Sequence, residues 1–190
     1  MIRTHSELLA YIESLVLKRP DFFVTELISP KEKIIQQNKR YSYLYIIKSG
    51  IVKCYLSDEN GKDFIQEFLS TGMEFGELEV FSEKPSFCCV ESITKLEVFK
   101  ISYTDFNKLL DTDTNFSRLI LKAMAKKISY KAPRHSYQQS YPIEDNILKL
   151  QELYPGIDKI ISKKDIASYM GVTMRSLNRA LNTLKHKPVK

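Results

Sequence analysis

Cysteine is scarce in this chain, and its few positions exclude two kinds of protein. The 190 residues include three cysteines, Cys54, Cys88 and Cys89. Their number and spacing suit neither a disulfide framework nor a CxxC metal site. A reducing cytoplasm is therefore the predicted location. We interpret the three thiols as small buried apolar groups, with a redox switch as the alternative.

Long apolar runs and histidines are also few. No run approaches the roughly 20 apolar residues that span a bilayer, and acidic residues interrupt the amino-terminal segment, which argues against a membrane anchor or a secretory signal. The histidines, His5, His135 and His186, all lie outside residues 24–101, where a β pattern is found. A cupin-type metal site is therefore not expected. Without a nucleophile–base pair at catalytic spacing, neither an enzyme nor a bound metal is predicted.

Positive charge is confined to one end of the chain. The protein has 29 basic and 23 acidic residues, a net charge of +6. Residues 160–190 contain seven basic residues and one acid, Asp165, so seven minus one accounts for the whole excess. This end of the chain is expected to bind a polyanion, with a solvated basic tail as the alternative.

Hydrophobic periodicity separates helical from β segments. Residues 6–17 have a helical apolar period, with Ser6 as the predicted cap. Between residues 24 and 101, short runs rich in β-branched and aromatic side chains alternate with turn signals, which predicts an antiparallel barrel or sandwich. The clearest runs are residues 43–47, 51–56, 63–69 and 95–101. Helical periods return at residues 103–111 and 115–130, and again from Pro142 to about residue 154.

The predicted helix at residues 115–130 carries an apolar stripe. Its members are Phe116, Leu119, Ile120, Ala123, Met124 and Ile128. We expect this stripe to pack against a second copy of the chain, and packing on the chain's own barrel is the alternative. Pro133 lacks a backbone donor and should end or kink the helix, so residues 131–142 are the predicted hinge.

Residues 162–184 have the steric pattern of a helix-turn-helix. Ser162 and Asp165 form a capping signature, Gly171 can adopt the left-handed backbone that ends a helix, and Thr173 can cap a second one. A small residue, a glycine and an apolar residue at positions 167, 171 and 177 have the required spacing. The inward face of the second helix comprises Leu177, Ala180, Leu181 and Leu184.

The outward face of that second helix is expected to read DNA. A helix fits the major groove, and arginine can bond guanine O6 and N7 together. The residues predicted to contact base edges are Met174, Arg175, Asn178 and Arg179. Those predicted to contact phosphates are Lys163, Lys164, Thr173 and Ser176. The alternative is a small helical subdomain with a solvated face.

The order of these parts resembles the Crp/Fnr family of bacterial transcription regulators. The carrying segments are YLYIIKSGIVKCYLSDENGKDFIQEFLSTGMEFGELEVF and ISKKDIASYMGVTMRSLNRALNTL, and the resemblance covers roughly residues 25–185. It implies an α+β fold with an antiparallel, cyclic-nucleotide-binding-like β-roll in residues 1–112. A dimerisation helix and hinge would follow in residues 113–139, and a helix-turn-helix domain in residues 140–190. The family continues into a β-hairpin wing, whereas this sequence ends at Lys190, so the wing is expected to be missing, either because the protein lacks it or because the sequence is truncated.

The resemblance also implies an effector pocket in the β-roll, formed here by Gly76, Glu77, Leu78, Ser86 and Phe87. In members that bind a cyclic nucleotide, a Gly-Glu pair opens a short helix at the phosphate, and an arginine after a proline pairs with its charge. Gly76 and Glu77 match the pair, but Ser86 stands at the arginine position. Cyclic-nucleotide binding is therefore not expected, and no other cofactor is identified. A turn retained from a shared fold is the alternative for Gly76 and Glu77.

These features predict a dimeric transcription regulator that reads a palindromic site in two major grooves about 34 Å apart. An unknown small effector, or another signal at the β-roll, would shift the long helix and so the two DNA-reading helices. The predicted partners are double-stranded DNA and a second copy of the chain, with RNA polymerase as a further candidate. The competing hypothesis is a ligand-binding or protein-interaction module whose helical tail does not read DNA.

Overall fold

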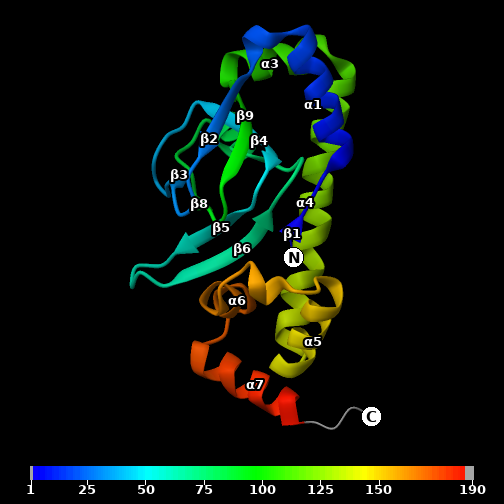
Figure 1. Cartoon of the computed structure of the whole chain (residues 1–190). Coiled ribbons are helices and arrows are strands. Elements are labelled where there is room, and N and C mark those ends of the chain that lie inside the picture. The colour runs from blue at the N-terminus through cyan, green and yellow to red at the C-terminus, as the bar shows by residue number, and fades with distance from the viewer. Residues whose placement is uncertain (1, 187–190) are drawn as a thin grey trace.

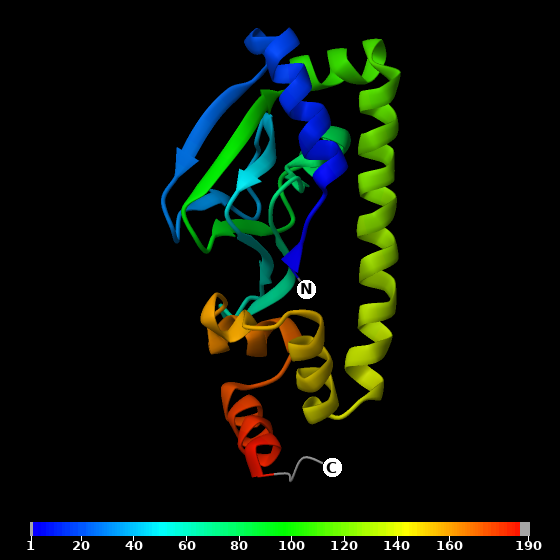
Figure 2. The ribbon, with the colours of Figure 1, turned by 45° about the vertical axis from the view of Figure 1, so that its right-hand side comes forward.

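The computed structural model describes the backbone of residues 2–186, and their side chains except those of residues 132–140, 153 and 186. A β-roll lies at one end, a helical unit lies at the other, and the long helix α4 runs beside both (Figures 1 and 2). In chain order the elements are β1 (Ile2–Arg3), α1 (Ser6–Lys18), η1 (Pro20–Phe22), β2 (Val24–Ile28), β3 (Lys33–Ile35), β4 (Tyr43–Ser49), β5 (Val52–Ser57), β6 (Asp63–Leu69), β7 (Glu74–Phe75), α2 (Glu77–Ser82), β8 (Cys89–Ser92), β9 (Leu96–Ser102), α3 (Tyr103–Thr112), α4 (Thr114–Ser140), α5 (Ile143–Leu153), η2 (Ile157–Lys159), α6 (Lys163–Met170) and α7 (Met174–His186).

The β-roll consists of two sheets whose strand orders are β1-β6-β5-β8-β3 and β2-β9-β4-β7. The paired strands are antiparallel, except that β1 runs parallel to β6. Apolar side chains from both sheets form one core, which includes Tyr45, Ile47, Val52, Phe75 and Val98. The four apolar runs identified in the sequence fall in β4, β5, β6 and β9, so the predicted antiparallel β fold is confirmed.

All three cysteines are buried, as the sequence indicated. Cys54 and Cys88 contribute to the core between the sheets, whereas Cys89 belongs to the core beneath the helical unit. Burial raises the pKa of Cys88 to about 12 and raises the pKa of Cys54 well above its usual value. These two thiols therefore stay protonated near neutral pH, which makes them poor nucleophiles.

Helix α1 begins at Ser6, but its cap is His5 rather than Ser6 as predicted. The Nδ1 atom of His5 accepts a hydrogen bond from the backbone N–H of Leu8 at 2.9 Å. The imidazole can act as a cap because its unprotonated nitrogen reaches a free amide in the first turn. Helices α1, α3 and α4 then pack with β4 and β9 around a second apolar core.

The inner face of α4 contains most of the predicted stripe, which packs on the chain's own β-roll and helices, the alternative to the expected contact with a second copy. One residue of the stripe, Ile128, needs a correction. Phe116, Ile120 and Ala123 are fully buried, but Ile128 is 69% exposed. At about 100° per residue, position 128 lies roughly 120° around the helix from position 116, whereas position 127 lies within about 20° of it. The residue that continues the buried stripe is therefore Lys127, which is 6% exposed.

Helix α4 also continues through Pro133 to Ser140, so residues 131–140 are helical, and only Tyr141 and Pro142 of the predicted hinge lie outside a helix. A proline removes one bond from the helical ladder, and the remaining i to i−4 bonds can keep the helix intact. The chain turns instead at Tyr141 and Pro142. Pro142 is the N-cap of α5 with extended backbone, not a first-turn residue as predicted.

Helices α6 and α7 form the predicted helix-turn-helix. The Oγ of Ser162 accepts from the backbone N–H of Asp165 at 3.1 Å, and Gly171 ends α6 with a φ of 69°. The Oγ1 of Thr173 accepts from the backbone N–H of Ser176 at 3.1 Å at the start of α7. A third core joins this unit to β5 and β6. Residues 187–190 lie outside the described residues, so the expected absence of a wing is not tested.

Within the described part of the chain, no helix is long and apolar enough to span a membrane. The proposed limits of the three domains, at residues 112 and 139, stay a prediction.

Gly72 supplies a test of how the amino-terminal segment is seated on the β-roll. Its φ is +80°, and an added Cβ would collide with the backbone carbonyl of His5. We expect Gly72→Ala to lower the free energy of unfolding in urea by about 1–3 kcal/mol more than Gly61→Ala. Gly61 is the matched control because it also has a positive φ, of +73°, but no atom lies within 4 Å of its added Cβ. Equal losses in the two variants would contradict this close approach.

Candidate functional site

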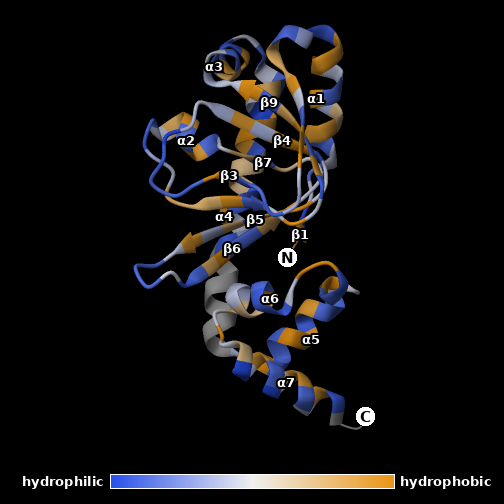
Figure 3. Ribbon diagram, turned by 60° about the vertical axis from the view of Figure 1, so that its left-hand side comes forward, coloured by the Kyte–Doolittle hydropathy of each residue, from blue (hydrophilic) through white to orange (hydrophobic). Residues whose placement is uncertain are grey.

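The predicted base-reading residues lie on one exposed face of α7. Arg175, Asn178 and Arg179 are exposed, and Met174 is 39% exposed. The opposite face is closed, since Leu177 is 1% exposed. In Figure 3, α7 lies at the end of the molecule furthest from the β-roll, and hydrophilic and hydrophobic residues alternate along it. The helix therefore has one face fixed in the core and a polar face free to contact a partner.

The predicted phosphate-contacting residues lie at the starts of α6 and α7. Lys163 and Lys164 are exposed in the first turn of α6. The hydroxyls of Thr173 and Ser176 are 3.0 Å apart at the start of α7, whose first turn contains no acidic residue. The amino-terminal end of a helix carries a partial positive charge, so the starts of α6 and α7 both suit an anionic partner. Lys163 and Asn178 also line one cavity of about 230 Å³ between α5, α6 and α7.

Helix α6 is bonded directly to the β-roll, a connection that was not predicted from the sequence. The Oγ of Ser168 donates to the backbone carbonyl of Asp63 and accepts from the backbone N–H of Ile65 at 3.2 Å. Within the described residues, β1 pairs with β6 only at its end, so α6 covers the open edge of the rest of that strand. The helix-turn-helix is therefore fixed against β6 (Figure 1). The same strand also lines the cavity of the β-roll that is described below.

An ion pair reinforces this contact. The Nζ of Lys53 on β5 lies 3.1 Å from Asp165 on α6 and 3.2 Å from Glu91 on β8. Burial by itself would lower the pKa of Lys53, but the carboxylates of Asp165 and Glu91 raise it. The lysine is therefore charged. The Asp165 carboxylate accepts a hydrogen bond from the hydroxyl of the N-cap residue Ser162 at 2.8 Å and also ties α6 to the β-roll through Lys53.

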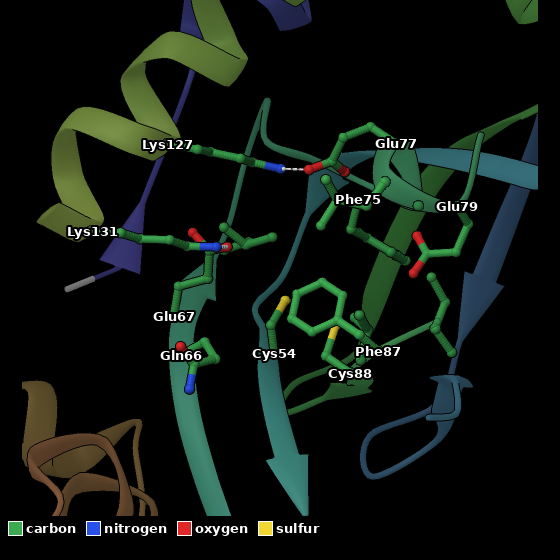
Figure 4. Close-up of a pocket in the computed structure, with 15 residues that line it drawn as sticks. Cys54, Gln66, Glu67, Phe75, Glu77, Glu79, Phe87, Cys88, Lys127 and Lys131 are labelled. Atoms are coloured by element: carbon green, nitrogen blue, oxygen red, sulfur yellow. Dashed lines mark hydrogen bonds and ion pairs between the residues drawn. The ribbon is translucent and has the colours of Figure 1, made fainter. Parts of the chain in front are cut away.

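The β-roll contains a small cavity beside α2 and α4 (Figure 4). Its volume is about 30 Å³, the space of roughly one water molecule. Of the predicted pocket residues, Gly76, Glu77, Leu78 and Phe87 line it, whereas Ser86 does not. The Ser86 side chain is 1% exposed, and its hydroxyl donates to the backbone carbonyl of Cys88 at 2.9 Å. It is thus committed to the loop rather than to the cavity.

Lys127 of α4 extends into the cavity from the side that faces Glu77 of α2. Its Nζ donates to Glu77 Oε1 at 2.7 Å and to the backbone carbonyl of Glu74 at 2.7 Å, and lies 3.0 Å from Glu74 Oε1. Burial by itself would lower the pKa of Lys127, but the carboxylates of Glu74, Glu77 and Glu67 raise it. Burial raises the pKa of Glu74, and the Lys127 ammonium partly offsets this. One buried cation is therefore shared by two carboxylates.

A second set of charges closes the cavity near its rim. Glu67 of β6 binds Lys131 at 2.8 Å and Arg3 at 2.9 Å. Burial by itself would raise the pKa of Glu67, but the nearby cations, Lys127 and Lys131 foremost, lower it. Glu79 also lines the cavity at 5% exposure, so the wall has three carboxylates, Glu67, Glu77 and Glu79, against two lysines. Negative charge on the wall therefore disfavours an anionic ligand.

Lys127, Lys131 and Glu74 were not among the residues predicted from the sequence. The signal for Lys127 was present, since it follows Phe116, Ile120 and Ala123 at helical spacing. A lysine next to an apolar stripe usually marks the boundary of the stripe with solvent, so the periodicity by itself does not indicate that Lys127 is buried. No group of three metal-binding side chains is found among the described residues.

The lowered pKa of Glu67 predicts a pH dependence. A carboxylate whose folded-state pKa is lowered stabilises the protein above its unfolded pKa, and this stabilisation is lost as the pH falls through the folded value. We expect the free energy of unfolding to fall as the pH is lowered below about 4.5, and to fall less steeply in Glu67→Gln. Urea unfolding between pH 7 and pH 3 measures both slopes. The exposed Glu59→Gln variant should retain the wild-type slope, and an unchanged slope in Glu67→Gln would contradict the assignment.

Comparison with known proteins agrees with this arrangement. Residues 25–113 match the cyclic nucleotide-binding domain family. The chain is 25% identical over 166 residues to the cAMP-activated global transcriptional regulator CRP of Salmonella typhimurium, covering 82% of this chain and 79% of that protein.

Solved structures share the fold from the β-roll to the helix-turn-helix. The c-di-GMP-responsive global regulator CLP of Xanthomonas campestris has a TM-score of 0.78 at 16% identity, covering 94% of this chain and 96% of that one. FixK2 of Bradyrhizobium japonicum has a TM-score of 0.72 at 20% identity, covering 86% and 84%. The chain therefore contains a cyclic nucleotide-binding-like domain and shares its order of β-roll, long helix and helix-turn-helix with solved structures of this fold, and it is similar in sequence to a transcription regulator of the Crp/Fnr type.

Proposed function

We propose that this protein is a dimeric regulator that binds double-stranded DNA and reads base edges with α7. The observation that carries the proposal is the two-sided character of that helix. Leu177 and Ala180 are each 1% exposed in the core, while Arg175 and Arg179 are exposed on the other side. A helix anchored in this way can enter the major groove without unfolding its own domain. The proposed place of action is the cytoplasm, and no catalytic role is proposed.

The charge of the chain supports the proposed DNA contact. The net charge of +6 equals that of residues 160–190, so the excess positive charge lies in and beside the helix-turn-helix. Lys163 and Lys164 stand at the start of α6, and Arg175 stands in the first turn of α7. Phosphate contacts by such groups release counterions and fix the orientation of the protein on the duplex.

We propose that two copies of the chain meet along α4. The buried face of α4 packs on the chain's own β-roll, but the outer face leaves Leu121 66% exposed and Ile128 69% exposed. These residues are seven apart, and the exposed Ala125 lies between them. An apolar seam with this spacing is typical of helices that pair side by side. Pairing along it would bring two copies of α7 to one DNA duplex.

We further propose that no cyclic nucleotide controls this protein. The relatives described above include a cAMP-activated and a c-di-GMP-responsive regulator. In this chain Ser86 is bonded to its own loop, carboxylates line the cavity, and about 30 Å³ remains inside it. These features favour a signal at the β-roll that does not depend on a bound phosphate. RNA polymerase is a further proposed partner, and DNA binding does not depend on it.

Substitution of the exposed arginines tests base reading. We expect Arg175→Ala or Arg179→Ala to weaken binding to the preferred palindrome by about 1–3 kcal/mol and to relax base preference at the contacted position. Lys163→Ala should weaken binding to all sequences alike and lower the salt slope by about one. Selection from a random duplex library followed by gel shift gives the site and both effects. Arg118→Ala, a matched exposed arginine on α4, should change neither.

Two outcomes would contradict the DNA-reading role. Equal loss on every sequence in Arg175→Ala would exclude base contact by that residue. If selection with the wild-type chain enriches no palindrome, the result would favour an interaction module whose helical tail does not read DNA.

Substitutions on the outer face of α4 test the dimer. We expect Ile128→Glu and Leu121→Glu to convert a dimer into monomers, because like charges would face each other across the seam. Sedimentation equilibrium measures the mass, and the same variants should lose affinity for the palindrome. Leu17→Glu is the control, since Leu17 is 86% exposed on α1 and lies outside the seam. A wild-type chain that sediments as a monomer would contradict the proposed dimer.

A further inference from the structure

The ammonium group of Lys127 is surrounded by oxygen atoms of the β-roll, as a free amine bound in a pocket would be. An ammonium has three donors, and in this pocket three oxygen atoms of the β-roll lie within hydrogen-bonding distance of Nζ. Glu77 Oε1 and the Glu74 backbone carbonyl, each at 2.7 Å, accept hydrogen bonds from it, and Glu74 Oε1 lies at 3.0 Å as an ion-pair partner without a hydrogen bond. Figure 4 shows the side chain reaching from α4 into the pocket toward Glu77. The side chain crosses from one element to another and ends in a set of oxygen atoms.

The carboxylates of the β-roll require a cation at this point. Glu74 is 0% exposed and Glu77 is 5% exposed, and both belong to the short segment that leads from β7 into α2. Two buried carboxylates with no cation between them repel each other and lose the hydration of both charges. Lys131 cannot replace Lys127 in the structure described here, because it pairs with Glu67 at 2.8 Å. The pocket is therefore built around one buried positive charge.

The space that remains beside Lys127 is too small for an effector. The cavity of about 30 Å³ has room for roughly one water molecule. Apolar side chains from both sheets, including Phe75 and Val90, line the rest of the cavity. A molecule larger than water would fit there only if side chains of the wall moved, Lys127 among them.

We propose that the β-roll pocket is a primary-ammonium site, which the chain fills with its own Lys127. The lysine acts as a built-in ligand that holds α4 against the β-roll, so the chain needs no small-molecule effector to reach this arrangement. A signal that moves α4 has to break the contacts of Lys127 with Glu74 and Glu77. Only this consequence for regulation rests on the proposed DNA-binding function; the ammonium site itself does not.

The test replaces the built-in ligand with a free one. Lys127→Ala removes Cγ, Cδ, Cε and Nζ, which together have the size and charge of n-propylammonium. We expect the melting temperature of Lys127→Ala to fall by about 6–20 °C, because two buried carboxylates lose their cation. Propylammonium should then raise it saturably and recover about half of the loss or more. Neutral n-propanol, and sodium chloride at the same ionic strength, should give no such recovery.

Three controls make the result specific. The wild-type chain should show no shift with propylammonium or with cAMP, because its site is filled. Lys131→Ala, one turn along α4, removes a lysine of the same length that pairs with Glu67, and propylammonium should not rescue it. The triple variant Lys127→Ala, Glu74→Gln, Glu77→Gln has no carboxylates left to bind the amine. It should be folded and unresponsive to propylammonium.

Each outcome supports or overturns the proposal. If Lys127→Ala does not fold by itself, recovery of folded protein during refolding in propylammonium supports the site, and failure to recover it, while the triple variant folds, overturns it. A Lys127→Ala chain as stable as the wild type, or one that propylammonium leaves unchanged, overturns it as well. A wild-type chain stabilised by cAMP overturns the claim that the pocket is filled. The DNA-binding proposal fails separately, through the absence of an enriched palindrome, and leaves the rescue result unaffected.

Discussion

The placement of α4 against the β-roll depends on a buried charge as well as on apolar packing. Phe116, Ile120 and Ala123 close one face of the helix, and this apolar burial supplies a non-directional attraction. A sliding or rotated helix could satisfy much of that attraction. Lys127 cannot slide, because its ammonium must meet Glu74 and Glu77 or leave three charges buried without partners. Apolar burial thus holds α4 to the β-roll, and the ion pairs fix its position along it.

Strand β6 connects the pocket to the helix-turn-helix over a short distance. Its Glu67 faces Arg3 and Lys131, while Asp63 and Ile65 on the same strand bond Ser168 of α6. The register of β6 is irregular between these points, since Glu67 pairs with Cys54 but Ile65 pairs with Tyr55. A bulge of this kind bends the strand and increases its twist. The helix-turn-helix therefore rests on the same strand whose carboxylate forms part of the pocket wall.

The two ends of the molecule handle charge in opposite ways. In the β-roll, charged groups are buried in pairs, and the pocket wall carries carboxylates. In α6 and α7, basic groups are exposed and mostly unpaired, with Asp165 drawn toward Lys53. Exposed charges act at a distance and are screened by salt, whereas buried pairs act only on contact. The same residue types are therefore exposed to a partner at one end and hold elements in position at the other.

The sequence by itself was sufficient to predict the helix-turn-helix and most strands. Ser162, Gly171 and Thr173 act on neighbours within four residues, so their capping roles follow from spacing alone. Only the tertiary structure decided the pocket. The Ser86 hydroxyl donates a hydrogen bond within its own loop, and Lys127 pairs with two carboxylates some fifty positions away in the chain. Helical periodicity could place Lys127 on the inner face of α4, but local spacing carries no information about which distant carboxylates will face it. The contact of Lys127 with these carboxylates is fixed by how the sheets and α4 pack. This packing determines whether a lysine is a solvated surface group or a buried ligand.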